Sequence, residues 1–188
     1  MHMINLLWPP QTIKLKNLGH TKVGTFQEIV YLANYQDQAI QSAIKQNKYQ
    51  ADQSAAQLLG TYLDQYLQQL PPDFIIIPMP VSYNRWRERG YNHIELIVNN
   101  SHYRKKVRSD ILQKTTHTKQ QTQVPRAQRV SQQRDTFTVS AQRANTLGTT
   151  VILLDDVVTT GSTMQAAKAA LEPTLSTHTN LICVAIAH

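Results

Sequence analysis

The feature that most constrains the fold is the segment at residues 151–163, VILLDDVVTTGST. Four apolar residues lead directly into Asp155 and Asp156, and a turn rich in threonine and serine then precedes a helical pattern. A short apolar run of this kind is typical of a buried strand, and strands that are apolar throughout are typical of parallel sheets covered by helices. Because strands and helices also alternate along the chain, the sequence predicts an α/β domain with a mainly parallel sheet.

The other segments supply this alternation. The clearest helix covers residues 52–70, where apolar residues recur at helical spacing until Pro71 and Pro72 stop it. Ligands of parallel sheets bind at the carboxyl ends of the strands, where the loops after Ile77 and Leu154 lie. The expected elements are helices within 27–49 and at 52–70, 91–98 and 161–171, strands at 74–78, 136–139, 151–154 and 181–187, and loops at 78–92 and over most of 113–146.

The bulk properties of the chain favour one domain of ordinary size. With 188 residues, of which 41% are apolar, the chain is long enough to bury a core without disulfides or metal. No apolar run approaches the length of a membrane span, so we expect no membrane insertion. The first ten residues lack the pattern of a signal peptide, and Cys183 is the single cysteine. We therefore expect a cytoplasmic protein.

The positive charge of the chain is concentrated in one segment. The formal net charge is +7, but residues 103–143 contain ten lysines and arginines and two acids, so this segment carries +8 and the rest of the chain −1. Concentrated positive charge indicates a phosphate-rich ligand or a nucleic acid, and the alternative is a solvated basic loop.

The turn after the two aspartates predicts a phosphate site. Backbone N–H groups at the start of a helix attract an oxyanion, and Gly161 allows the backbone to approach it closely. Ionised carboxylates only accept hydrogen bonds, so Asp155 and Asp156 suit a vicinal diol or Mg²⁺ beside the phosphate. An ATPase of the P-loop class is excluded because no G-x-x-x-x-G-K-[ST] motif is present. A phosphoacceptor site is disfavoured because it should follow the first strand, and a plain turn capped by aspartate remains an alternative.

These residues resemble a known family signature. Residues 151–163 look like the thirteen-residue signature of type I phosphoribosyltransferases, which bind phosphoribosyl pyrophosphate. More narrowly, residues 35–188 resemble the ComF (ComFC/GntX) family of competence-associated, phosphoribosyltransferase-like proteins. Besides the signature, the matching segments are KQNKY at 45–49, IIIPMP at 75–80, RWRERGYN at 85–92, TKQQ at 118–121, and Arg129 with Phe137.

The resemblance implies a fold and a division of the chain. The fold would be that of a type I phosphoribosyltransferase, with a central parallel sheet flanked by helices. Residues 1–50 would form a small N-terminal hood, and residues 51–188 the phosphoribosyltransferase domain, with a flexible basic loop at about 103–137. The family usually begins with a zinc ribbon of paired cysteines, but residues 1–34 contain none, so we expect no zinc.

The resemblance also implies site residues. Asp155 and Asp156 would be catalytic residues that bind the ribose hydroxyls, and Mg²⁺ would arrive with the phosphoribosyl pyrophosphate. Two positions depart from the family pattern, which has glutamine at His93 and asparagine at Gln132. The 5-phosphate would be bound by Val158, Thr159, Thr160, Gly161, Ser162 and Thr163, the pyrophosphate by Pro78, Met79, Pro80 and Arg89, and the flexible loop or a nucleic acid would involve Arg85, Tyr91, Asn92, Thr118, Gln121 and Arg129.

The implied activity is Mg²⁺-dependent transfer of ribosyl 5-phosphate from phosphoribosyl pyrophosphate to a nitrogen nucleophile. The implied biological role is in competence, the uptake of DNA in natural transformation. An alternative is a module without catalytic turnover that binds phosphoribosyl pyrophosphate or single-stranded DNA and docks to DNA or an uptake helicase.

Overall fold

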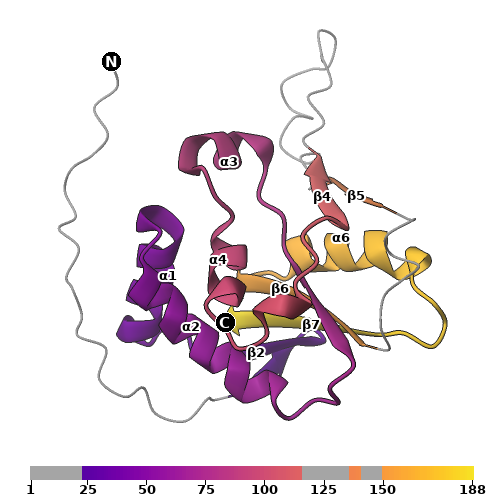
Figure 1. The fold of residues 1–188 in the computed structure, drawn as a ribbon, viewed down its shortest axis with the longest axis horizontal. Coiled ribbons are helices and arrows are strands. Elements are labelled where there is room, and N and C mark those ends of the chain that lie inside the picture. Colours follow the sequence, from indigo (N-terminus) through magenta and orange to yellow (C-terminus); the bar gives the residue numbers. More distant parts are fainter. Residues whose placement is uncertain (1–22, 116–135, 141–149) are drawn as a thin grey trace, which may run out of the picture.

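The computed structural model describes residues 23–115, 136–140 and 150–188. Its centre is a five-stranded sheet with the strand order β1-β2-β7-β6-β3 (Figure 1). The edge strand β1 runs antiparallel to β2, and the other three pairs are parallel, which confirms the predicted α/β class with a mostly parallel sheet. The strands are β1 (Gly24–Phe26), β2 (Ile29–Ala33), β3 (Phe74–Pro78), β6 (Thr150–Val157) and β7 (Asn180–Ala187).

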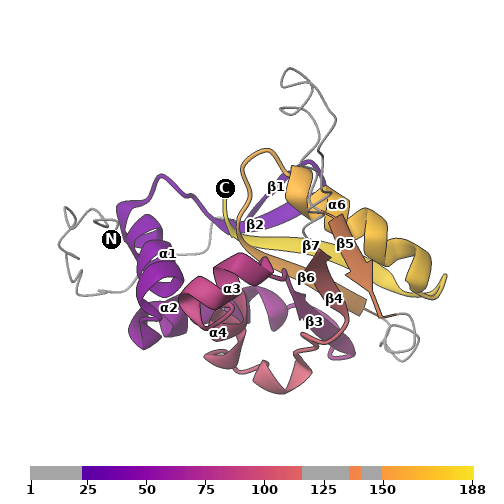
Figure 2. The ribbon, with the colours of Figure 1, turned by 90° about the horizontal axis from the view of Figure 1, so that it is seen from above.

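Two layers cover the sheet (Figure 2). One face packs against α1 (Gln38–Gln50), α2 (Gln53–Leu67) and α4 (His93–Asn99). The other face packs against α6 (Ser162–Leu171) and a two-stranded antiparallel sheet of β4 (Leu112–Thr115) and β5 (Thr136–Val139). The remaining helices of the described residues are α3 (Tyr83–Arg89), η1 (Arg104–Lys106) and η3 (Glu172–Thr174).

Alternation along β6 explains why both layers are needed. Successive side chains of a strand point to opposite faces of the sheet. Ile152 and Leu154 belong to the core under α1, α2 and α4, whereas Val151 and Leu153 belong to the core under α6. All four side chains are fully buried, so this strand is apolar on both faces until it reaches the aspartates.

The side chain of Tyr91, which precedes α4, binds the backbone at the end of α1. The helix ends at Ala51, whose φ of 52° lies in the left-handed region, and α2 begins directly afterwards. The hydroxyl of Tyr91 donates to the carbonyl of Asn47 at 2.9 Å and accepts from the backbone N–H of Ala51 at 3.0 Å. Tyr91 therefore fixes the last turn of α1, which carries Lys48.

The structure confirms most of the predicted elements and lengthens one of them. The predicted strands at 74–78, 136–139 and 181–187 and the helix at 161–171 agree with β3, β5, β7 and α6 to within one residue. The strand predicted at 151–154 was too short, because β6 stays paired with β7 up to the pair Val157 and Ala187. Both aspartates consequently lie inside the strand, and their side chains leave it on opposite faces of the sheet.

The predictions for residues 27–49 and 78–92 were partly wrong. The first of these segments contains β2 before the helix, which starts only at Gln38, and Asp37 caps that start by accepting from Ala39 N at 2.8 Å. The second contains α3, which buries none of its residues and so shows no apolar period. The predicted loop over residues 113–146 also begins inside a strand, β4, which was missed.

The helical layer includes part of the N-terminal segment of the chain. The strand β2 pairs with β7 inside the main sheet, and α1 packs against α2 across the expected boundary at residue 50. Within the described ranges, no helix is long and apolar enough to cross a membrane.

The contact between α2 and α4 generates the first prediction. A Cβ atom at Gly60 would lie 3.1 Å from the backbone oxygen of Asn100 and 3.2 Å from that of Ile97. In an open helix Gly→Ala stabilises by about 0.5–1 kcal/mol, but overpacking costs about 1–3 kcal/mol. We expect Gly60→Ala to lower the free energy of unfolding by about 1 kcal/mol in urea denaturation, because rigid backbone atoms oppose the new methyl group.

Gln57→Ala provides the matched control. Gln57 lies on the exposed face of the same helix, so its substitution should change the free energy of unfolding by less than about 0.5 kcal/mol. A Gly60→Ala protein that is more stable than the wild type would show that α4 moves freely away from α2.

Candidate functional site

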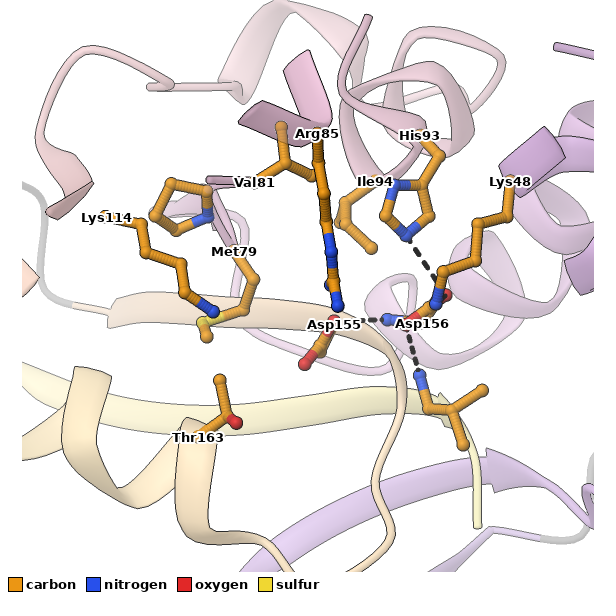
Figure 3. Close-up of a pocket in the computed structure, with 12 residues that line it drawn as sticks. Lys48, Met79, Val81, Arg85, His93, Ile94, Lys114, Asp155, Asp156 and Thr163 are labelled. Carbon is orange, nitrogen blue, oxygen red and sulfur yellow. Dashed lines mark hydrogen bonds and ion pairs between the residues drawn. The ribbon is translucent and has the colours of Figure 1, made fainter. Parts of the chain in front are cut away.

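The candidate site lies where β3 and β6 end side by side. The pairing of Pro78 with Leu154 places the carboxyl ends of both strands at the same edge, and Met79 N donates to Leu154 O at 2.7 Å just beyond it. A pocket of about 270 Å³ opens at this edge (Figure 3). Its wall includes both aspartates of the signature and three cationic side chains, Lys48, Arg85 and Lys114.

Asp156 is the most constrained polar residue of the pocket. Its side chain is 7% exposed. The Oδ2 atom lies 3.2 Å from Lys48 Nζ and 3.1 Å from His93 Nε2, and the Oδ1 atom accepts from Val157 N at 2.8 Å. Because an ionised carboxylate only accepts hydrogen bonds, His93 donates from Nε2. Three donors therefore hold both oxygens of Asp156.

Hydrogen bonds at the start of α4 place His93 at the pocket. Asn92 caps the helix by accepting from Ile94 N at 2.9 Å, and its amide donates to Met79 O at 3.1 Å. The amide of Asn47 donates to the backbone carbonyl of His93 at 2.9 Å. These bonds tie the first turn of α4 to the chain after β3 and to α1, which leaves His93 only 4% exposed.

Asp155 has a different environment from its neighbour. Its side chain is half-buried at the pocket and accepts from Asp156 N at 2.9 Å. Burial and the adjacent negative charge of Asp156 raise the pKa of Asp155 to about 8. Burial alone would also raise the pKa of Asp156, but the hydrogen bonds and charges of His93 and Lys48 outweigh it and hold this pKa well below its usual range.

The turn at residues 158–163 follows β6, and of its residues Thr163 lines this pocket, whereas Val158 and Thr159 line a neighbouring one. Gly161 has a φ of 75° and is the N-cap residue of α6, so no side chain at the cap position accepts a hydrogen bond. Thr159 and Thr160 are exposed, and the Thr160 hydroxyl lies 3.0 Å from that of Ser162 and accepts from Ser162 N at 3.5 Å. Backbone N–H groups at the start of a ten-residue helix attract an oxyanion, so the turn has the chemistry of a phosphate site.

The back of this turn is held by the end of β7. Val158 is buried, and its backbone N–H donates to Ala187 O at 3.0 Å. The carbonyl of Val158 accepts from Nδ1 of His188 at 3.0 Å. These two bonds fix the turn on the side that faces away from the pocket.

The structure brings together some of the predicted residues and separates others. Both aspartates, Met79, Pro80, Arg85 and Thr163 line the pocket, whereas Pro78 lies behind it in β3. Arg89, expected at the pyrophosphate, does not line the pocket, and its guanidinium lies 5.1 Å from the ring centre of Tyr49. Tyr91 and Asn92 support the site from behind. Thr118, Gln121 and Arg129 lie outside the described residues.

Sequence reasoning did not assign Lys48, His93 or Lys114 to the site. Lys48 lies in the segment KQNKY of the family resemblance, and His93 directly follows the segment RWRERGYN. This resemblance is the one signal in the sequence that could have pointed to them. The burial of His93 against Asp156 depends on tertiary packing and leaves no trace in the sequence.

A scan against models of known protein families and a search of curated proteins found no match to this chain. In the part of the chain that the structure describes, no group of three or more histidine, cysteine, aspartate or glutamate side chains is arranged to hold a metal ion.

The opposite environments of the two aspartates predict opposite effects of their substitution on stability. The folded protein keeps the Asp155 proton up to a pKa of about 8, whereas an unfolded chain releases it near a pKa of about 3.9. The free energy of unfolding therefore falls as the pH rises between these values, by at most about 1.4 kcal/mol per pH unit. We expect Asp155→Asn to be more stable than the wild type at pH 8, with a difference that shrinks towards pH 4.

Asp156→Asn should show the reverse behaviour. The lowered pKa of Asp156 contributes stability above its unfolded pKa, which is lost as the pH falls through the folded pKa. This variant should lose about 1–3 kcal/mol at pH 7 because His93 and Lys48 lose their negatively charged acceptor. Urea denaturation from about pH 2 to pH 8 tests both variants, and parallel pH profiles for all three proteins would contradict the assignment.

Proposed function

We propose that the pocket binds phosphoribosyl pyrophosphate with Mg²⁺ and transfers its ribosyl 5-phosphate to a nitrogen nucleophile. One observation carries this proposal. Thr163 in the first turn of α6, which follows the left-handed Gly161, lines the same pocket as the carboxyl of Asp155 and three cationic side chains. An anion site beside an acceptor of hydroxyl hydrogen bonds suits a phosphorylated sugar better than a bare phosphate.

The charges of the pocket match the parts of such a ligand. The turn at residues 158–163 would bind the 5-phosphate through its backbone N–H groups and hydroxyls. Arg85 and Lys114 would bind the pyrophosphate, since guanidinium and ammonium groups make strong hydrogen bonds to phosphate oxygens. Asp155 would accept from the ribose hydroxyls that lie between these two ends.

The residues present also fit Mg²⁺. This ion is usually bound by one or two carboxylates together with phosphate oxygens and water, and Asp155 provides one carboxylate at the pocket. When bound, Mg²⁺ would neutralise charge on the pyrophosphate as it leaves. The residues of the chain would orient the sugar and exclude water from it.

The proposed reaction breaks the bond between C1 of the ribose and the pyrophosphate oxygen and forms a bond from C1 to nitrogen. The nitrogen loses a proton to solvent, and pyrophosphate leaves with the electron pair of the broken bond. Positive charge develops on the sugar during this step, and a carboxylate at the position of Asp155 would stabilise it. Holding both ends of the ligand keeps C1 in place for the attack.

We further propose a role in competence, on the basis of the family resemblance. A binding module for single-stranded DNA is the alternative, and the basic residues of the segment that lie within the described residues are found in two places. Lys114 reaches the pocket, whereas Arg104 and Lys105 are exposed in η1. Lys106 donates to the carbonyls of Pro72 and Phe74, which places η1 at the amino end of β3, away from the pocket.

Calorimetric titration with phosphoribosyl pyrophosphate and Mg²⁺ tests the proposal. We expect micromolar binding by the wild type and a loss of at least about tenfold, or 1.4 kcal/mol, in the double variant Asp155→Asn/Asp156→Asn. The control is Arg104→Gln/Lys105→Gln, which removes two bases outside the pocket and should bind normally.

The same proteins decide between the two candidate functions. A wild type that does not bind phosphoribosyl pyrophosphate, but binds single-stranded DNA with a steep salt dependence that the Arg104→Gln/Lys105→Gln variant reduces, would favour the DNA-binding module.

Two glycines with the same backbone conformation provide a second test. Gly161 and Gly90 have φ values of 75° and 78°. A Cβ at Gly161 would lie 2.9 Å from Gln27 Oε1 and 3.3 Å from Ile29 Cδ1, whereas a Cβ at Gly90 would meet nothing within 4 Å. Alanine at either position should cost about 1–2 kcal/mol of stability through left-handed strain.

Only Gly161→Ala should also weaken binding of phosphoribosyl pyrophosphate, because contact of its methyl group with Gln27 and Ile29 would shift the turn that would hold the 5-phosphate. Titration of the two alanine variants under identical conditions measures the difference. Equal affinities in both variants would argue against a phosphate at residues 158–163.

A further inference from the structure

We infer that the two adjacent aspartates have different roles: Asp156 is a positioning residue held by Lys48 and His93, and Asp155 is the carboxylate that faces the ligand. This inference deepens the proposed function and rests on it for the identity of the ligand. It assigns Lys48 and His93 as positioning residues that act through Asp156, and it departs from an equal role for both aspartates in binding the ribose.

The hydrogen bonds of Asp156 leave it little capacity for a ligand. Its Oδ2 atom is shared by Lys48 Nζ at 3.2 Å and His93 Nε2 at 3.1 Å, and its Oδ1 atom is bound by Val157 N at 2.8 Å. Three of about four acceptor positions of this carboxylate are therefore occupied, and the group is 7% exposed, which leaves little access for a ligand hydroxyl or a metal ion. These hydrogen bonds therefore suit Asp156 to a positioning role and not to ligand binding.

The two side chains that hold Asp156 are themselves held. Lys48 lies in the last turn of α1, which the Tyr91 hydroxyl binds at both Asn47 O and Ala51 N. His93 lies in the first turn of α4, where its carbonyl accepts from the amide of Asn47. Two helices therefore converge on one carboxylate of β6, and their relative position depends on it.

His93 is placed to position Asp156 and not to exchange a proton with the ligand. Its Nε2 atom is used by Asp156, and its Nδ1 atom is buried with no hydrogen-bond partner among the described residues. Figure 3 shows the ring with Nε2 towards Asp156 and its other nitrogen turned away from the pocket. No nitrogen of His93 is left to act on a ligand.

Asp155 has the complementary arrangement. Alternation along β6 directs it to the other face of the sheet, and its Oδ1 atom accepts from Asp156 N. Figure 3 shows Arg85 extending down to Asp155, with Lys114 and Thr163 on the same side of the pocket. The charged or titratable groups that face Asp155 are thus Asp156, Lys48, His93, Arg85 and Lys114.

Ligand affinity at one fixed pH distinguishes the two roles. Asp155→Asn removes the carboxylate that would face the ligand and should weaken binding of Mg²⁺ and phosphoribosyl pyrophosphate by at least about tenfold in calorimetric titration. Lys48→Met and Asp156→Asn leave the carboxylate of Asp155 in place and only loosen its surroundings, so each should weaken binding by less than about tenfold.

Lys48→Arg serves as the conservative control, because it keeps the positive charge beside Asp156 and should restore the wild-type affinity. An Asp156→Asn protein that loses as much affinity as Asp155→Asn would overturn the inference. So would an Asp155→Asn protein that binds as tightly as the wild type.

A measurement without ligand separates failure of this inference from failure of the proposed function. Urea denaturation of Lys48→Met, Asp156→Asn and the double variant forms a double-mutant cycle, in which the losses should be non-additive because the two side chains are in contact. If the wild type binds no phosphoribosyl pyrophosphate, this cycle still decides the inference, and additive losses would reject it.

Discussion

The pairing of β6 with both β3 and β7 is the constraint on which the rest of the structure depends. Both neighbours run parallel to β6, so the carboxyl ends of these strands meet at one edge of the sheet. Apolar side chains on both faces of β6 require a layer on each side, which α1, α2 and α4 provide on one side and α6 on the other. The aspartates then fall where the apolar run ends and the layers separate, which is where a pocket can open.

The two adjacent aspartates have different surroundings because the strand directs their side chains to opposite faces of the sheet. Adjacent residues of a strand face opposite sides, so Asp156 points to the helical layer and contacts Lys48 and His93, while Asp155 points to the other face, although both line the pocket. Identical side chains thereby acquire opposite shifts in pKa, upward for Asp155 and downward for Asp156. Pairs of acids whose pKa values are pushed apart in this way are typical of functional sites.

The parts of the site that were predictable are those whose chemistry is local. The aspartates, the glycine and the hydroxyl side chains lie within thirteen consecutive residues, so their pattern was visible in the sequence. Lys48 and His93 were not assigned, because their role depends on a partner that lies 108 and 63 positions away. The strand β2 was missed for the same reason, since its neighbour β7 lies at the other end of the described chain. Arg85 was expected in a loop, and α3 escaped detection because it has no buried face.

The convergence of α1, α4 and β6 on Asp156 has a consequence for how the protein folds. Contacts between residues far apart in sequence form late, because the chain entropy of closing long loops opposes them. During synthesis, Lys48 and His93 emerge well before the carboxylate that they hold, and the first two helices can dock without it. The pocket is therefore completed only when β6 inserts between β3 and β7, so the ability to bind a ligand reports that the whole sheet has assembled.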